Sequence, residues 1–174
     1  MIYFKETSIG KIGIEEKDGF ISKLIFEDDI KNINKTGKKR IGCIDCRDCV
    51  DYDEKTAPPI LSEAFSQLDE YLIGDRTVFD LPLAPKGTPF MEKVWAALSE
   101  IPYGQTATYK EIAAAVGNPN ASRAVGMANN KNPISIFIPC HRVVGSGGKL
   151  VGYAGGIDLK QKLLTLENKK CNEK

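Results

Sequence analysis

Cys140 and His141 are the residues best suited to covalent chemistry in this chain of 174 residues, and His141 is its only histidine. A thiolate is a strong nucleophile, and an imidazole can accept the thiol proton. The proton could pass directly or, because adjacent side chains of an extended segment point apart, through a bridging water. Glu167 follows Leu163 by four residues on the apolar face of a predicted C-terminal helix. A buried carboxylate needs a partner, so we expect Glu167 to orient His141. The alternatives are a solvated Glu167 and a Cys140 that is only a small buried side chain.

Three predicted elements position this cluster. The apolar run 134–138 predicts a short buried strand that delivers Cys140 at its end, where functional groups often lie. A glycine-rich loop follows over residues 145–156. The chain then closes with a helix whose predicted inward residues are Leu159, Leu163 and Leu166.

Two short helices upstream form a helix-turn-helix candidate. Thr108 and Glu111 have the spacing of a capping box that opens the first helix, which ends at Gly117. Asn118-Pro119 predicts the start of the second helix, which runs towards Asn129. Small residues would let the backbone of this helix lie close against another surface, and they are Ala121, Ala124, Gly126 and Ala128.

The other elements predict an α+β fold with two domains, residues 1–85 and 86–174. In the first, short runs predict antiparallel strands over 12–15 and 20–26, joined by a hairpin at Asp18-Gly19. A loop or weak strand covers 27–57, and a linker rich in Pro and Gly covers 74–87. A helix begins at Pro59, with the apolar face Leu61, Ala64, Phe65, Leu68 and Leu72. The mainly helical second domain opens with a helix capped at Thr88, with the apolar face Phe90, Val94, Ala97, Leu98 and Ile101.

Composition and charge narrow the class of protein. Hydrophobic residues make up 42% and charged residues 27%, which is typical of a folded globular chain. The first 85 residues carry 12 Lys and Arg against 17 Asp and Glu, whereas the remainder carries 12 against 6. A basic half suits a polyanion, with a merely solvated surface as the alternative. Because no membrane span or export signal is recognisable, we expect a cytoplasmic protein with reduced thiols.

The segment Ile138-Pro139-Cys140-His141-Arg142-Val143-Val144 resembles the active-site motif of the O6-alkylguanine-DNA alkyltransferases. The resemblance is strong over residues 88–168 and weaker over the N-terminal hairpin and helix. Order and spacing also agree in five further segments, which are 108–113 (TYKEIA), 117–119 (GNP), 123–126 (RAVG), 132–133 (NP) and 152–156 (GYAGG).

This resemblance implies direct, irreversible transfer of an alkyl group from guanine O6 in double-stranded DNA to Cys140, with O4-alkylthymine as a further candidate substrate. The target base would be flipped out of the stack, because its O6 atom is out of reach inside the duplex. The family approaches from the minor groove, which suits a helix rich in small residues. The implied protein is a single-turnover methyltransferase that needs no cofactor, and we expect it to be a monomer.

Residue roles follow from the matching positions. Cys140 would be the acceptor, His141 the water-mediated base and Glu167 its orienting carboxylate. Tyr109 would assist flipping and then bond the guanine, and Asn132 would hold the active-site turn. On the second helix, Arg123 would fill the space left by the flipped base, and the DNA-contacting residues around it would be Ala124, Gly126 and Met127. The base pocket would be formed by Val143, Tyr153, Ala154 and Lys160, although some family members have Ser where this chain has Ala154.

Cys43, Cys46 and Cys49 form two consecutive C-x-x-C steps that the resemblance does not explain. They suggest a soft-metal site, with Cys171 or an Asp as the fourth ligand, but the second half of a paired zinc signature is absent. A loop of reduced thiols is the default interpretation.

Three other functions compete with alkyl transfer. A lesion sensor would bind damaged DNA without a nucleophile, which Cys140 argues against. A Cys-His-Glu hydrolase would turn over without DNA, and a transcription regulator would prefer one DNA sequence and leave Cys140 unmodified.

Overall fold

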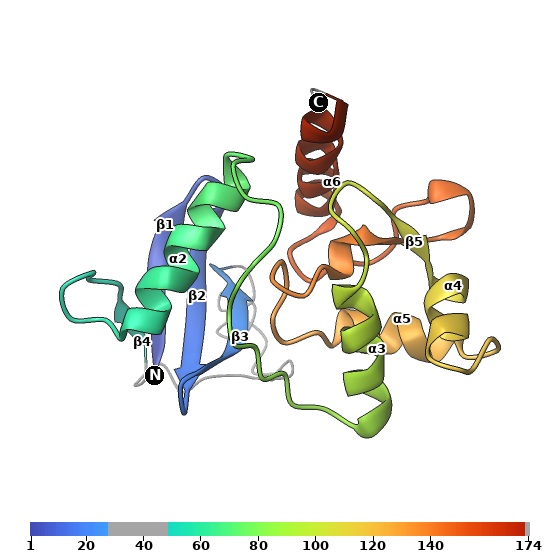
Figure 1. Ribbon diagram of the computed structural model, residues 1–174, viewed down its shortest axis with the longest axis horizontal. Coiled ribbons are helices and arrows are strands. Elements are labelled where there is room, and N and C mark those ends of the chain that lie inside the picture. Colours follow the sequence, from blue (N-terminus) through green and yellow to red (C-terminus); the bar gives the residue numbers. More distant parts are fainter. Residues whose placement is uncertain (28–48, 173–174) are drawn as a thin grey trace. The chain divides into compact units, whose positions relative to one another are not determined.

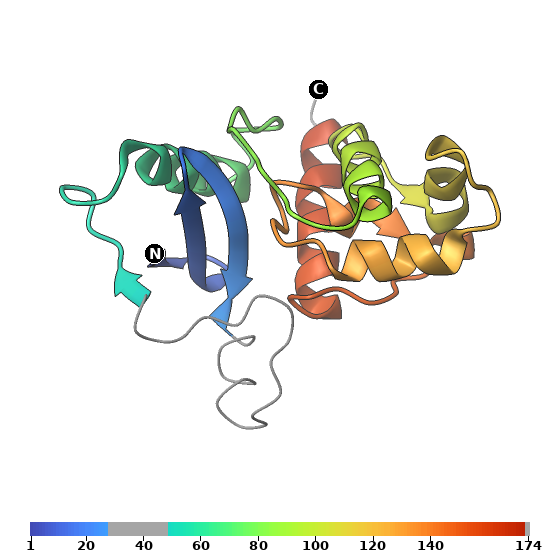
Figure 2. The same ribbon diagram turned by 90° about the horizontal axis from the view of Figure 1, so that it is seen from below.

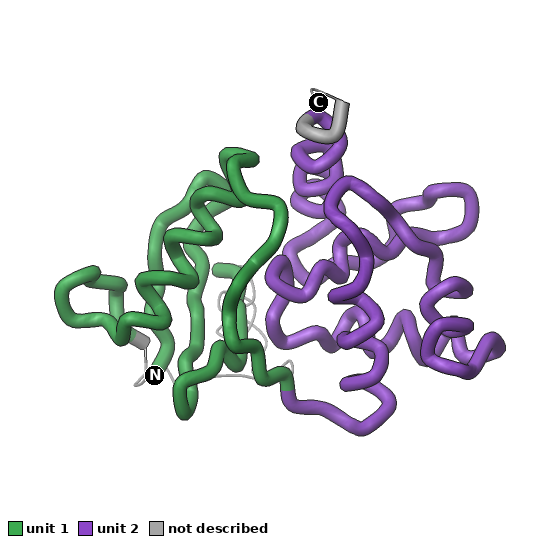
Figure 3. The backbone as a smooth tube through the Cα atoms, viewed as in Figure 1, with its two compact units in different colours: residues 1–85 green, residues 86–174 purple. Residues whose placement is uncertain are grey.

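The computed structural model describes residues 1–27 and 49–172, and for residues 49 and 170–172 it describes the backbone alone. The chain divides into two compact units, Met1–Pro85 and Lys86–Lys174 (Figure 3). Within the part of the chain that is described, no helix has the length and apolar character needed to cross a membrane. Cys43 and Cys46 lie outside the described residues, as does the side chain of Cys49.

The first unit contains a four-stranded sheet in the order β3-β2-β1-β4. Strands β1 (Ile2–Thr7), β2 (Gly10–Lys17) and β3 (Phe20–Phe26) pair antiparallel, which confirms the predicted hairpin and adds β1 to it. Asp18 and Gly19 form its turn with φ of 54° and 82°, the left-handed conformation that Asp-Gly turns accept. The short strand β4 (Cys49–Asp51) pairs parallel to β1, so the expectation of antiparallel strands holds for three of the four.

Helix α2 (Pro59–Leu72) lies across one face of this sheet and contacts β1, β2 and β3 (Figure 1). Pro59 starts the helix as predicted, because proline at the first helical position loses no hydrogen bond. Tyr71 is buried in place of the expected Leu72, which is half-buried. The other buried residues of the helix are Leu61, Ala64, Phe65, Gln67 and Leu68.

The second unit is built mainly of helices α3 (Pro89–Ser99), α4 (Tyr109–Ala115), α5 (Ser122–Asn130) and α6 (Ile157–Asn172). Helices α3, α4 and α5 pack against one another, and both views show α5 beside α3 (Figure 2). A parallel pair of two-residue strands, β5 (Ala107–Thr108) and β6 (Val143–Val144), joins distant parts of this unit. The architecture confirms the predicted α+β fold class with its helix-turn-helix.

Local cap signals position two of these helices. The side chain of Thr88 accepts a hydrogen bond from the Met91 N–H at the start of α3. At the start of α4, the Thr108 side chain accepts from the Glu111 N–H, and the Glu111 carboxylate accepts from the Thr108 N–H in return. This reciprocal pair is the predicted capping box, and it satisfies amide groups that have no partner within the helix.

The start of α5 was predicted too early. Asn118-Pro119 forms a turn instead, in which the Ala121 N–H donates to the Asn118 carbonyl at 2.9 Å, and the helix begins at Ser122. Proline is equally favoured at the second position of a β-turn, so the same dipeptide fits both structures. The turn between α4 and α5 is therefore longer than the sequence suggested.

The predicted strand over 134–138 is also wrong, although its burial is right. The Ile138 N–H donates to the Ile134 carbonyl at 2.9 Å, which closes a tight turn, and Ile136 adopts a φ of 74°. A left-handed conformation is rare for a β-branched residue and costs free energy, so the surrounding contacts must hold the turn. An apolar run of this length cannot distinguish a buried strand from a buried turn.

Helix α6 buries two ionisable side chains together with two leucines on its inner face. Leu163 is buried as predicted, but Leu159 and Leu166 are only half-buried. Lys160 and Glu167 take their place, each 0% exposed, together with the apolar Leu164. Two buried ionisable groups on one helix face require dedicated partners, and both find them around Cys140.

Candidate active site

Asn132 holds the turn that precedes Cys140. Its side-chain amide donates to the Ile138 carbonyl at 2.9 Å, and its side-chain oxygen accepts from the Ile134 N–H at 3.0 Å. These two bonds span the turn and stabilise it against the strain at Ile136. The side chain thus makes contacts within the motif segment, as the family resemblance implied for Asn132.

Cys140 opens the short 3-10 helix η2 (Cys140–Arg142), which packs against α3 and α6. Its thiol is buried, and Sγ lies 3.8 Å from the Ser135 hydroxyl oxygen. Burial raises the pKa of this thiol above its ordinary value, while hydrogen bonds from Asn132 and Ser135 and the charge of Lys160 act in the opposite direction. The resting group is therefore a thiol at neutral pH, and a base must remove its proton before sulfur can attack.

The predicted pair of His141 and Glu167 is present, with 2.9 Å between Nε2 and Oε1. Both side chains are fully buried. Arg142 completes the cluster: its Nε and one terminal nitrogen donate to the carboxylate at 3.0–3.2 Å, and its other terminal nitrogen donates to the Ile101 carbonyl at 2.6 Å. The Gly104 N–H donates to Glu167 Oε2 at 3.0 Å. The carboxylate is thus surrounded by donors.

These donors fix the protonation states of the pair. Although burial acts to raise it, the hydrogen bonds and charges of His141 and Arg142 lower the pKa of Glu167 from 4.5 to about 2. Burial lowers the pKa of His141, so its imidazole is neutral at neutral pH. An ionised carboxylate only accepts, and Nε2 must therefore carry the imidazole hydrogen. Nδ1 is left with the lone pair, which is the arrangement a proton acceptor requires.

The Lys160 ammonium group joins the two segments that flank the cluster. Its Nζ donates to the carbonyls of Val143 at 2.6 Å and Val151 at 3.0 Å. Tyr153 is buried, with its ring edge-on to the His141 ring and 6.4 Å between centroids. Ala154 is half-buried next to it in the sequence. Four residues predicted to form the base pocket, Val143, Tyr153, Ala154 and Lys160, therefore belong to segments that adjoin Cys140.

Helix α5 presents the predicted DNA-binding residues on its surface. Arg123, Ala124 and Met127 are exposed, the last at 59%. Gly126 is half-buried, and a Cβ atom built on it would lie 3.7 Å from the ring of Tyr109. The Tyr109 hydroxyl donates to the Val151 carbonyl at 3.3 Å. The tyrosine thus bridges α5 and the glycine-rich loop that reaches Lys160.

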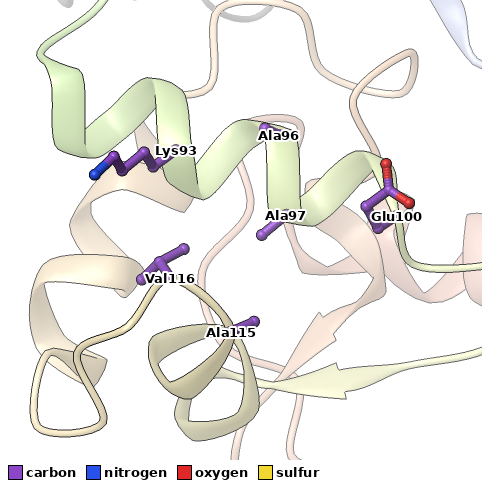
Figure 4. A pocket seen from close by; sticks show the side chains of 6 residues that line it. All are labelled: Lys93, Ala96, Ala97, Glu100, Ala115 and Val116. Atoms are coloured by element: carbon purple, nitrogen blue, oxygen red, sulfur yellow. The ribbon is translucent and has the colours of Figure 1, made fainter.

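A groove of about 550 Å³ lies between α3 and the end of α4 in this unit (Figure 4). None of the predicted site residues line it; its side chains belong to Lys93, Ala96, Ala97, Glu100, Ala115 and Val116. Over residues 1–27 and 50–169, whose side chains are described, no three His, Cys, Asp or Glu residues are grouped so as to hold a metal ion. The thiols of Cys43, Cys46, Cys49 and Cys171 lie outside the described side chains, so the metal site suggested by the sequence stays a prediction.

Arg142 and Ser135 are the site residues that sequence reasoning missed. Arg142 is 6% exposed and Ser135 is 2% exposed. A buried Glu167 needs a positively charged partner. The sequence prediction paired it with His141 alone, although Arg142 directly follows His141 in the chain. No comparable signal existed for Ser135, because a strand over 134–138 does not define where its hydroxyl points.

The fold and site define a cysteine-dependent protein with a helix-turn-helix in the same unit. Two comparisons with a known family agree with this. Residues 3–85 match the family description "6-O-methylguanine DNA methyltransferase, ribonuclease-like domain", and residues 89–169 match "6-O-methylguanine DNA methyltransferase, DNA binding domain". The chain belongs to the 6-O-methylguanine DNA methyltransferase family.

Individual relatives cover most of the chain. A methylated-DNA–protein-cysteine methyltransferase of Methanosarcina acetivorans is 52% identical over 142 residues, which is 81% of this chain and 86% of the relative. The constitutive enzyme of that name from Bacillus subtilis is 43% identical over 170 residues, covering 97% and 96%. Among solved structures, Mycobacterium tuberculosis OGT in complex with DNA superposes with a TM-score of 0.79 and 37% identity, covering 97% of this chain and 93% of that one.

Proposed function

We propose that this chain repairs DNA by transferring an alkyl group from O6-alkylguanine to Cys140 in a single, irreversible turnover. The observation that carries the proposal is a buried thiol, followed directly in the chain by a neutral histidine whose Nε2 is held by an ionised carboxylate. Family membership supplies the substrate class, since the relatives carry the name methylated-DNA–protein-cysteine methyltransferase. Duplex DNA is the proposed partner, and the Mycobacterium tuberculosis protein has been solved in complex with DNA.

The chemical step is a displacement at the alkyl carbon. The Cys140 thiol gives its proton to His141 through a bridging water, and the thiolate attacks the carbon attached to O6. The carbon–sulfur bond forms as the carbon–oxygen bond breaks, and the guanine anion that leaves takes a proton at N1 from water. The imidazolium returns the thiol proton to water, so the protons balance. Glu167 accepts from Nε2 throughout and stabilises the imidazolium that forms. The thioether product has no leaving group for water, so the step occurs once per chain.

Helix α5 is the proposed DNA-contacting surface. Arg123 is exposed on it, which suits a side chain that enters the base stack when the target nucleotide rotates out. Gly126 and Met127 lie three and four residues further on and therefore share its side of the helix. Ala124 and Gly126 keep the surface low, which suits an approach through the narrow minor groove. Tyr109 adjoins Gly126 and is placed to assist the rotation.

The flipped base would lie between η2 and the glycine-rich loop. The Cys140 carbonyl accepts from the Val143 N–H, and the Val143 carbonyl accepts from Lys160. Each carbonyl oxygen has a second lone pair, which we propose receives the guanine amino group. Tyr153 would pack against the alkyl group, and the Ala154 N–H would donate towards O6. An alanine leaves this backbone donor intact where a serine would add a side-chain donor.

Intact-mass measurement of the chain before and after incubation with a duplex containing one O6-methylguanine tests the proposal. We expect the mass of one methyl group to be added, saturating at one per chain, with peptide mapping to Cys140. Cys140→Ala serves as the control, because it keeps the proposed DNA surface and should bind the duplex without gaining mass. Binding with unchanged mass in the unaltered chain would instead identify a lesion sensor. Turnover of an ester substrate without DNA would identify a hydrolase.

Three finer points belong to the same proposal. The protein acts on the damaged base rather than on one DNA sequence, it acts as a monomer, and it resides in the cytoplasm, where its thiols stay reduced. Size-exclusion chromatography with and without the duplex tests the oligomeric state. Competition with undamaged DNA of varied sequence tests the preference for the lesion.

A further inference from the structure

We propose that Ser135 is a catalytic residue whose hydroxyl donates a hydrogen bond to the Cys140 thiolate. This inference rests on the proposed function for its role in repair, but the contact itself belongs to the free protein. Sγ and Oγ lie 3.8 Å apart, within hydrogen-bond range for sulfur, and both residues are 2% exposed. Both groups are therefore shielded from bulk solvent.

The backbone holds the hydroxyl in this position. Ser135 lies within the turn closed by the Ile138 N–H and the Ile134 carbonyl, and it bridges to Ile138 across that turn. The side chain of Asn132 ties both ends of the turn, and the Cys140 N–H donates to the Ile138 carbonyl at 2.8 Å. The sulfur and the hydroxyl thus belong to one hydrogen-bonded unit, so little conformational entropy is lost when they bond.

A hydroxyl can serve both protonation states of sulfur. In the resting site the Cys140 thiol donates to the Ser135 oxygen. When the thiol proton leaves for His141, the Ser135 O–H rotates about its C–O bond and donates to the sulfur. Ser135 keeps its own proton and no bond to it breaks. A hydrogen bond to a charged acceptor is about twice as strong as a neutral one, so the contact favours the thiolate over the thiol.

Other groups also act on the titration of Cys140 and must be kept constant. Tyr109 on α4 and Lys160 on α6 interact electrostatically with the thiol, and Asn132 hydrogen-bonds to it. On the side of η2, the neighbours form the ionic cluster of His141, Arg142 and Glu167. The buried residues of α3 contribute no titratable group and are Val94, Trp95 and Leu98. A variant at Ser135 alters none of these side chains.

The test is a titration of the thiolate by its ultraviolet absorbance in the chain and in Ser135→Ala. Subtracting the curve of the matching Cys140→Ala protein removes the other four cysteines. We expect Ser135→Ala to raise the pKa of Cys140 by about one unit, as the loss of one charge-assisted hydrogen bond requires. Ser99→Ala is the control, since it removes an exposed hydroxyl from α3 and should leave the pKa of Cys140 unchanged.

The rate of methyl transfer provides a second readout. At neutral pH the thiolate population falls about tenfold in Ser135→Ala, but the more basic sulfur is about threefold more nucleophilic. The rate of methyl transfer should therefore show a deficit of roughly three- to fourfold. That deficit should shrink as the pH rises towards the pKa of Cys140. A structural role alone would slow the reaction by the same factor at every pH.

An unchanged pKa of Cys140 in Ser135→Ala would overturn the inference, as would a deficit that does not depend on pH. Trp95, the only tryptophan and a buried one, reports by fluorescence whether each variant is folded. If the alanine variant does not fold, Ser135→Thr replaces it in the titration. Because threonine keeps the hydroxyl, the pKa of Cys140 in Ser135→Thr must match that of the unaltered chain, and a raised pKa of Cys140 contradicts the inference. Because the titration needs no DNA, a chain that accepts no methyl group would refute the proposed function and leave this test intact.

Discussion

Replacing Glu167 with glutamine should destabilise the second unit strongly at neutral pH and barely at low pH. The carboxylate is 0% exposed and accepts from His141, Arg142 and the Gly104 N–H. In glutamine one oxygen becomes an NH₂ group that faces donors, and Arg142 keeps a buried charge without a counter-charge. Breaking a buried ion pair by removing one partner costs about 3–5 kcal/mol, so we expect a loss of that size at neutral pH.

The dependence on pH follows from the pKa of Glu167, which folding lowers from 4.5 to about 2. A carboxylate with a lowered pKa stabilises the folded state above its unfolded pKa, and this stability is lost as the pH falls through the folded value. A shift of about 2.5 units corresponds to about 3 kcal/mol. The difference in free energy of unfolding between the chain and Glu167→Gln should therefore shrink by about 3 kcal/mol between about pH 5 and pH 2.

Urea unfolding followed by Trp95 fluorescence measures this difference, because Trp95 lies in the same unit as Glu167 and donates to the Ala128 carbonyl at 2.9 Å. Glu100→Gln is the matched control: its exposed carboxylate should contribute within about 0.5 kcal/mol. A difference for Glu167→Gln that is constant over the acidic range would refute the ionised, donor-saturated carboxylate. So would a loss at neutral pH no larger than that of the control.

Three further outcomes are expected. Gly126→Ala should raise the free energy of unfolding by up to about 1 kcal/mol, because alanine favours a helix and its Cβ has room against Tyr109. The same variant should bind the duplex more weakly in a titration, and unchanged binding would argue against close approach of α5 to DNA. Arg123→Ala should slow methyl transfer from duplex DNA far more than from the free base, and equal slowing would argue against stacking. Methylated Cys140 should melt at a lower temperature than the free thiol, because the added methyl group has to be accommodated around a buried sulfur. Calorimetry that finds no shift would contradict this.

The local elements of this protein could be predicted from its sequence because their signals lie within a few residues of the structure they specify. The Asp18-Gly19 hairpin and the Thr108–Glu111 capping box are of this kind. The pairing of His141 with Glu167 was also predictable, although it spans 26 residues, because a buried carboxylate had a single histidine available. The chain has one histidine, so a pairing between histidine and a buried carboxylate had only one candidate.

Tertiary structure alone decided the turn at Ile136, the burial of Arg142 and the contact between Ser135 and Cys140. The apolar run 134–138 fits a strand or a turn equally well, and the choice depends on the side-chain bonds of Asn132. Lys160 is a similar case, because the helical pattern places it on an apolar face. Its burial there is stabilised by hydrogen bonds from Nζ to the carbonyls of Val143 and Val151. The sequence determines which groups must find partners when they are buried, because the cost of desolvation belongs to a single residue. The packing of distant segments determines which partners reach them, because a hydrogen bond requires two residues.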